Sequence, residues 1–129
     1  MTAAADEELF TFAGPDEFEA WLAEHHDGLA IWLKIAKKGS GHTTVTIPEA
    51  LQVCLCYGWI DSQRRALDEK FFLQRYSRRR RGSPWSKINT GLVADLIASG
   101  RMQVPALAEV EAAQEDGRWA AALQQGAAS

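Results

Sequence analysis

The spacing of apolar residues predicts a helix followed by a strand in the first third of the chain. Over residues 16–26, apolar side chains recur at intervals of three and four, as on one face of an amphipathic helix. Residues 29–35 are short, apolar and aromatic, which is typical of a buried strand. A brief apolar segment at 9–12 is expected to be extended.

A second helix, over residues 46–57, is predicted by its first residues and its composition. Thr46 and Glu49 have the spacing of a capping box, and Pro48 suits the first turn of a helix. Almost every side of this segment is apolar, so we expect it to pack at the centre of the core. Gly58 is expected to end it.

A β-hairpin is predicted next, with strands at 59–67 and 71–76 joined by a turn at 68–70. Strict alternation places four side chains of its first strand on one face: Trp59, Asp61, Gln63 and Arg65. The polar ends of both strands are then free to line a cleft.

Two further helices and a last helical turn complete the prediction. Ser83 as cap and Pro84 as first residue predict a helix that ends near Gly100. Its inward residues are expected to be Trp85, Ile88, Leu92, Leu96 and Ile97. A helix from Pro105 is expected to turn Leu107, Val110 and Ala113 inward, before a final turn that carries Trp119 and Leu123.

These elements predict an α+β fold, in which a small antiparallel sheet with a hairpin is packed by several helices. We expect one domain over residues 9–123, a disordered tail at 1–8 and a short tail at 124–129. The chain has no apolar run of about 18 residues, so no membrane span is expected. The N-terminus lacks the features of a signal peptide. Cys54 and Cys56 are expected to be reduced, buried thiols of a cytoplasmic protein.

Charge is distributed unevenly along the chain. Residues 57–89 hold nine of the 14 Lys and Arg residues but only three acids, a net charge of +6. The rest of the chain carries −9, which gives the overall charge of −3. The basic segment is therefore the first place to look for a site that binds an anion.

The predicted site combines the hairpin with the start of the helix at Ser83, where free backbone amides favour an anion. Its expected ligand-binding residues are Trp59, Asp61, Gln63, Arg65, Arg79, Arg80, Ser83, Trp85, Ser86, Lys87 and Asn89. Asp61 would orient the neighbouring arginines, or act as a base if the protein is an enzyme. The alternatives are that Asp61 makes a structural salt bridge, that Trp85 belongs to the core, and that the arginines are solvated.

Other chemistry finds little support in the sequence. His25 and His26 are adjacent and His42 lies in a predicted loop, so the three do not form a metal set. The segment KKGSG lacks the spacing of a phosphate-binding loop and is interpreted as a solvated turn. We expect neither a metal nor a cofactor.

The motif order resembles a known family. The segments ALQVCLCYGWIDSQ, SPWSKIN, GRM and DGRW look like those of the bacterial YdeI/OmpD-associated proteins, also labelled bacteriocin-protection proteins. The resemblance runs from about Phe18 to Trp119. It implies a small α+β domain and a link to tolerance of antimicrobial peptides or envelope stress, and it implies no established reaction.

Three functions follow as hypotheses. The preferred one is a non-catalytic binding module for an anionic small molecule or an acidic partner surface. The second is nucleic-acid binding through Arg64, Arg65 and residues 78–81, with a base stacked on Trp85. The third is an enzyme that acts on an anionic substrate with Asp61 as base. The sequence does not identify a ligand or an oligomeric state.

Overall fold

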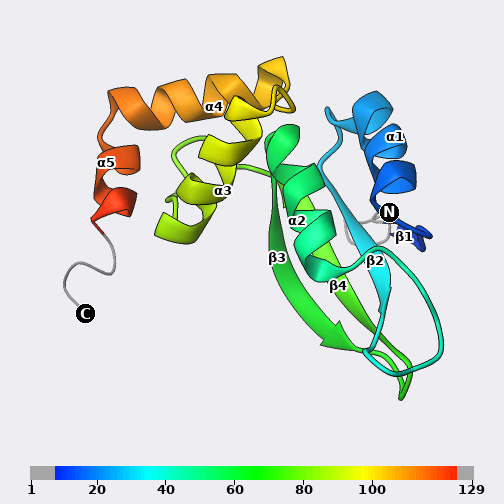
Figure 1. Ribbon diagram of the computed structural model, residues 1–129. Coiled ribbons are helices and arrows are strands. Elements are labelled where there is room, and N and C mark those ends of the chain that lie inside the picture. The colour runs from blue at the N-terminus through cyan, green and yellow to red at the C-terminus, as the bar shows by residue number, and fades with distance from the viewer. Residues whose placement is uncertain (1–7, 125–129) are drawn as a thin grey trace, which may run out of the picture.

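The computed structural model describes residues 8–124. Apart from Glu8 and Gln124, the expected tails at 1–8 and 124–129 lie outside the described residues. Within the described part, one four-stranded sheet is combined with five helices, which confirms the α+β class. Helices α1 (Pro15–His25) and α2 (Ile47–Cys56) lie against the sheet, and α3 to α5 gather beyond its upper end (Figure 1).

The strands are arranged in the order β1-β2-β4-β3. Strands β2 (Ala30–Ala36), β4 (Phe71–Arg78) and β3 (Trp59–Ala66) are antiparallel neighbours, so the predicted hairpin is confirmed. The short strand β1 (Leu9–Phe10) pairs with β2 in parallel, which makes the sheet mixed. The sequence predicted this segment only as extended, so its parallel pairing adds to the predicted antiparallel sheet.

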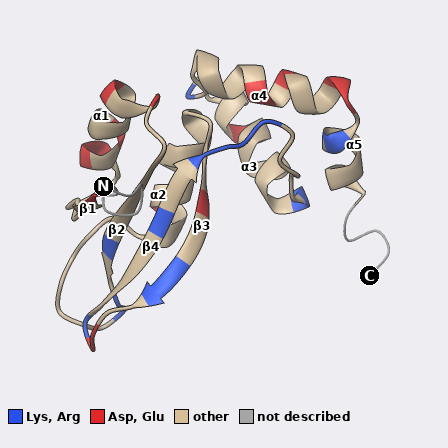
Figure 2. Cartoon of the chain, turned by 180° about the vertical axis from the view of Figure 1, so that it is seen from behind, with Lys and Arg blue, Asp and Glu red and all other residues tan. Residues whose placement is uncertain are grey.

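The alternation in β2 separates the two faces of the sheet. Ile31, Leu33 and Ile35 are buried, and the residues between them are only partly covered. The buried side, called here the inner face, packs against α1 and α2, where Phe18 approaches Tyr76 with ring centroids 6.1 Å apart. The opposite side is called the outer face, and in the rear view the strands lie in front of α2 (Figure 2).

Helix α2 forms as its sequence predicts. Thr46 accepts a hydrogen bond from the Glu49 amide while Glu49 accepts one from the Thr46 amide, which is a complete capping box. Gly58 follows the helix with a φ of 80°, and a Cβ there would lie 3.6 Å from the backbone of Ala106. Cys54 and Cys56 are buried free thiols, as expected.

A β-bulge in β3 corrects the predicted alternation. Asp61 pairs with Tyr76 and Arg64 pairs with Gln74, so β3 contains one extra residue between these two pairs. Asp61 and Arg64 therefore share the inner face, whereas Arg65, opposite Leu73, lies on the outer face. Gln63 lies within the bulge, and its carbonyl accepts a hydrogen bond from the buried side chain of Gln74 at 2.9 Å.

The third helix begins later than predicted. Helix α3 spans Lys87–Ala98, and Ser86 rather than Ser83 caps it by accepting a hydrogen bond from the Asn89 amide. The shift changes which side faces the core. Val93 and Leu96 are buried, whereas two residues that were expected inward, Ile88 and Ile97, are 75% and 43% exposed.

Two further helices end the described chain. Helix α4 (Val104–Glu115) buries Ala106 in place of the predicted Leu107, together with Val110 and Ala113 as expected. Gly117, with a φ of 88°, starts helix α5 (Arg118–Leu123), which packs on α3 and α4. Trp119 packs against the core, whereas Leu123 is half exposed.

Replacement of Leu55 by Ala tests the central position of α2. Leu55 is 2% exposed, so its loss should leave a cavity and lower the free energy of unfolding by about 2–5 kcal/mol. Ile88→Ala is the matched control, because Ile88 projects into solvent from α3 and its truncation should cost less than about 0.5 kcal/mol. Chemical denaturation measures both, and equal losses would contradict the positions of the two helices.

Candidate functional site: a basic outer face with two hollows

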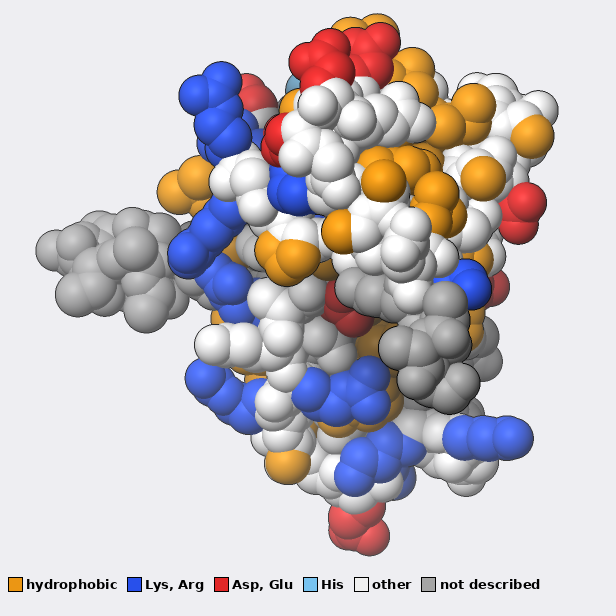
Figure 3. All heavy atoms as spheres, turned by 90° about the vertical axis from the view of Figure 1, so that its left-hand side faces the viewer, with side chains coloured by type: hydrophobic (Ala, Val, Ile, Leu, Met, Phe, Trp, Pro, Cys, Tyr) orange, Lys and Arg blue, Asp and Glu red, His pale blue; other side chains and the backbone are white. Residues whose placement is uncertain are grey.

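The outer face of the sheet combines cations with apolar side chains. By the pairing register, the described residues of β2, β4 and β3 that lie on this face include three cations and no carboxylate. They are Ala30, Trp32, Lys34, Ala36, Ile60, Arg65, Phe71, Leu73, Arg75 and Ser77. Figure 2 shows Lys and Arg on each of the three strands and along the connector that follows β4. In the side view, basic side chains gather on the lower part of the molecule and continue up one flank (Figure 3).

Cations on this face lie over aromatic rings. The Arg65 guanidinium lies 4.7 Å from the ring centroid of Trp32, and the Lys34 ammonium lies 4.2 Å from that of Phe71. Arg75 donates a hydrogen bond to the Ser62 hydroxyl at 3.1 Å, which ties β4 to β3. The outer face is therefore a surface on which positive charge and aromatic area are interleaved.

At the upper end of the outer face the arginines surround a hollow of about 440 Å³. We call it the arginine hollow; its lining residues are Leu29, Arg75, Ser77, Arg78, Arg79, Arg80 and Arg81. No carboxylate is among these described lining residues. Guanidinium groups held together without counter-charge raise the local potential, so an anion that enters the hollow is attracted by several of them at once.

Arg79 differs from its neighbours because its side chain is buried. Only 6% of the residue is exposed, and its guanidinium lies 3.6 Å from the ring centroid of Trp85. One terminal nitrogen donates to the Ser83 hydroxyl at 2.8 Å and to the Pro84 carbonyl at 3.1 Å. The solvated state that the sequence suggested for all four consecutive arginines is therefore wrong for Arg79.

Burial lowers the pKa of Arg79 to about 10, although Glu109 acts in the opposite direction. The group still carries its charge at neutral pH. Its stacking on an indole ring and its two hydrogen bonds offset part of the cost of desolvation. The buried Nε atom has no hydrogen-bond partner within the described residues, so this compensation is incomplete.

Helix α5 closes this cluster from the other side. Arg118 donates a 2.6 Å hydrogen bond to the Ser83 carbonyl and forms a 2.7 Å ion pair with Asp116. Trp119 packs against Trp85 with ring centroids 5.1 Å apart. The connector between β4 and α3 is thereby held at Arg79, Ser83 and Trp85, while Arg80 and Arg81 stay exposed.

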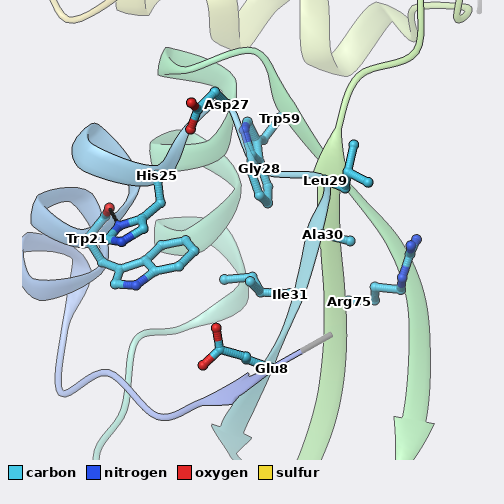
Figure 4. Close-up of a pocket in the computed structure, with 10 residues that line it drawn as sticks. All are labelled: Glu8, Trp21, His25, Asp27, Gly28, Leu29, Ala30, Ile31, Trp59 and Arg75. Carbon is cyan, nitrogen blue, oxygen red and sulfur yellow. Dashed lines mark hydrogen bonds between the residues drawn. The ribbon is translucent and has the colours of Figure 1, made fainter. Parts of the chain in front are cut away.

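A second hollow, of about 480 Å³, adjoins the first at the start of β2 (Figure 4). We call it the aromatic hollow; its lining residues are Glu8, Trp21, His25, Asp27, Gly28, Leu29, Ala30, Ile31, Trp59 and Arg75. The rings of Trp21 and His25 are stacked 4.4 Å apart and 9° from parallel. A 2.7 Å hydrogen bond between His25 Nδ1 and the Trp21 carbonyl fixes the imidazole.

The structure separates most of the residues that the sequence grouped into one site. Of the predicted residues, only Arg79 and Arg80 line the arginine hollow, and only Trp59 contributes to the wall of the aromatic hollow. Trp59 is buried and its indole donates to the His26 carbonyl, while Trp85 belongs to the core, which was the alternative considered for it.

The remaining predicted residues serve the fold or lie elsewhere. Ser83 binds Arg79, Ser86 caps α3, and Lys87 and Asn89 belong to the first turn of that helix. The prediction of a helix that starts at Ser83 and faces the arginines was therefore wrong. The hydrogen bond from Arg79 to Ser83 keeps this segment outside the helix. Gln63 and Arg65 lie on β3, away from the lining of both hollows.

Asp61 neither orients the neighbouring arginines through an ion pair nor makes a structural salt bridge among the described residues. It is exposed on the inner side of β3 opposite Tyr76, and it forms no ion pair with Arg64 or Arg65 within residues 8–124. Arg64 instead donates to Gln74 at 3.0 Å and lies over Phe72. Sequence reasoning missed Trp21 and His25 as site residues, although their spacing of four on one helix was a usable signal.

Comparison with known proteins identifies the family. The family model described as a domain of unknown function, DUF8412, matches residues 10–109, so the chain belongs to that family. No curated protein and no solved structure matches the chain significantly. The resemblance to the YdeI/OmpD-associated proteins is not tested by these findings and stays a prediction.

Two further properties concern the described part of the chain. None of its helices combines the length and the apolar character needed to cross a membrane. Within residues 8–124, His, Cys, Asp and Glu form no group of three or more that could hold a metal ion.

Arg79→Lys tests whether the buried guanidinium holds the connector. A lysine ammonium cannot lie flat on Trp85 while donating to Ser83 and Pro84, so we expect a loss of about 1–3 kcal/mol in the free energy of unfolding. Arg80→Lys is the matched control on the adjacent, exposed residue, and it should change stability by less than about 0.5 kcal/mol. Equal stabilities of the two variants in urea would mean that the Arg79 contacts contribute little.

Proposed function

We propose that the protein is a binding module for ligands that carry a phosphate or carboxylate group, which they place in the arginine hollow. One observation supports the proposal above the others: the hollow is lined by five arginines and a serine, with no carboxylate among its described lining residues. Arg79 also lines the hollow, but its side chain is engaged with Trp85 and Ser83. The anion would therefore interact with Arg75, Arg78, Arg80 and Arg81.

The chemistry of these groups favours binding over catalysis. Guanidinium groups present planar arrays of donors that match carboxylate and phosphate oxygens, and they keep their protons at neutral pH. Ser77 adds a hydroxyl from β4. Asp61, the candidate base of the enzyme hypothesis, lines neither hollow, so the geometry gives that hypothesis no support.

Titration with inorganic phosphate and sulfate tests the anion site. Amide shifts of Ser77 and residues 80–82 in NMR spectra should saturate at millimolar anion, because several guanidinium groups act on one ion. Arg80→Ala combined with Arg81→Ala should weaken binding about tenfold or more. The same anions should raise the melting temperature of the wild type and not that of the double variant.

The matched control removes two other exposed cations. Lys37→Ala combined with Lys38→Ala changes the net charge equally, but these lysines lie in the loop after β2 and line neither hollow. Its affinity for phosphate should stay within about twofold of the wild type at moderate salt, where distant charges are screened. No saturable shift in the wild type, or equal losses in both double variants, would reject the arginine hollow as a site.

A second candidate function is the binding of single-stranded nucleic acid on the outer face. The observation that favours it is the pairing of Arg65 with Trp32 and of Lys34 with Phe71 on a helix-free face. A bound strand would draw these cations onto its phosphates, which frees the rings for base stacking. This arrangement replaces the earlier expectation of stacking on Trp85, whose ring is buried.

Salt dependence tests this second function. The affinity for a single-stranded oligonucleotide, measured by fluorescence anisotropy, should fall with a log–log slope of about −0.7 for each phosphate contacted. Arg65→Ala should reduce that slope, whereas the exposed Lys38→Ala should not. An affinity that is weak and independent of salt would leave only the small-anion function.

The physiological part of the proposal rests on the sequence resemblance alone. The GWID and WSKIN segments suggest a bacterial protein that contributes to tolerance of antimicrobial peptides or envelope stress. A cytoplasmic location is part of the same proposal and agrees with two buried free thiols. Survival of a deletion strain under peptide challenge, with complementation by the wild type and by Arg80→Ala/Arg81→Ala, would connect the site to this role.

A further inference from the structure

The two hollows meet at the start of β2. Both are lined by Leu29 and Arg75, so a ligand that crosses Leu29 touches both at once. Leu29 is 72% exposed although it is a large apolar side chain, and it points away from the Trp21 side of the strand (Figure 4). A ligand that covers it would remove apolar surface from water, which is favourable.

The aromatic hollow suits a flat ring. The Trp21 and His25 rings, stacked on each other, form one wall of the hollow, and Ile31 of β2 and Trp59 of β3 contribute to its lining (Figure 4). Aromatic rings pack favourably against such a surface when they stack with an offset. The volume of about 480 Å³ lies within the range of small-ligand sites.

The charges that line the two hollows differ. Glu8 and Asp27 line the aromatic hollow and not the arginine hollow. Carboxylates accept hydrogen bonds and repel anions, so a ring bound beside them needs donor groups such as amino groups. A ligand that fills both hollows therefore needs an anionic group at one end and an amino-bearing ring at the other.

Nucleotides combine these two features. We propose that the two hollows form one site for a nucleoside monophosphate whose base carries an amino group. The phosphate occupies the arginine hollow, the sugar crosses Leu29, and the base lies on the Trp21–His25 wall within reach of Asp27 or Glu8. This inference rests on the proposed anion site and adds the class of ligand to it.

Calorimetric titration with four compounds tests the inference. Adenosine monophosphate should bind more tightly than inosine monophosphate, which lacks the amino group, and at least about tenfold more tightly than ribose phosphate. Adenosine should bind weakly because it lacks the anion. In NMR spectra, the indole signal of Trp21 should shift with the nucleotide and stay in place with inorganic phosphate.

Asp27→Asn supplies the matched variant. It keeps the size of the side chain and removes the charge that favours an amino group, so the affinity for adenosine monophosphate should fall about five- to tenfold. The affinity for ribose phosphate should not fall, and an unchanged melting temperature shows that the fold is intact. Glu24→Gln, an exposed acid outside both hollows, should leave both affinities unchanged.

The outcomes separate the inference from the proposed function. If ribose phosphate binds as tightly as the nucleotide and Asp27→Asn has no effect, the nucleotide inference is overturned while the anion site stands. If adenosine alone binds as tightly as its monophosphate, the aromatic hollow acts by itself, and the joint site is rejected. If none of the four compounds binds, both the inference and the anion site fail.

Discussion

The stack of Arg79 on Trp85 is the contact on which the geometry of the arginine hollow depends. A charged group that is 94% buried is tolerated only where the surrounding groups replace part of its hydration, and here these are an indole ring, a hydroxyl and a carbonyl. The contact fixes the connector directly after β4. Arg78 and Arg80 flank the buried residue and are exposed, and both line the arginine hollow together with Arg75 and Arg81.

Local rules in the sequence sufficed where a few neighbouring residues decide the structure. The capping box of α2, the turn of the hairpin at Asp68 and the apolar strand β2 all formed as predicted, because each depends on residues close together in the sequence. The predictions failed where contacts with residues far away in the sequence determine the structure. Ser83 and Ser86 both satisfy the rules for a helix cap, but Arg118 of α5 binds the Ser83 carbonyl and Arg79 binds the Ser83 hydroxyl, which leaves the role to Ser86.

The positive charge of the candidate site could be predicted from the sequence, but the arrangement of its side chains could not. The excess of arginine in residues 57–89 indicated an anion site, and the arginine hollow lies within that segment except for Leu29. The bulge at Gln63 then moved Arg64 to the inner face and Arg65 to the outer one, which no rule of alternation anticipates. Trp85 looked like a stacking platform because it follows four arginines, yet one of those arginines covers it.

The separation of charge across the molecule also bears on the kind of ligand. Most acidic residues lie on the helices, chiefly α1 and α4, and most basic ones on the strands and the connector after β4 (Figure 2). The net charge of −3 repels a long polyanion at a distance, while screening over about 8–10 Å leaves the arginine hollow positive for an ion that has entered it. A small anion interacts mainly with the arginine hollow, whereas a long nucleic-acid strand also comes close to the acidic helices. The charge distribution therefore favours a small ligand over an extended nucleic acid, even though both could use the same arginines.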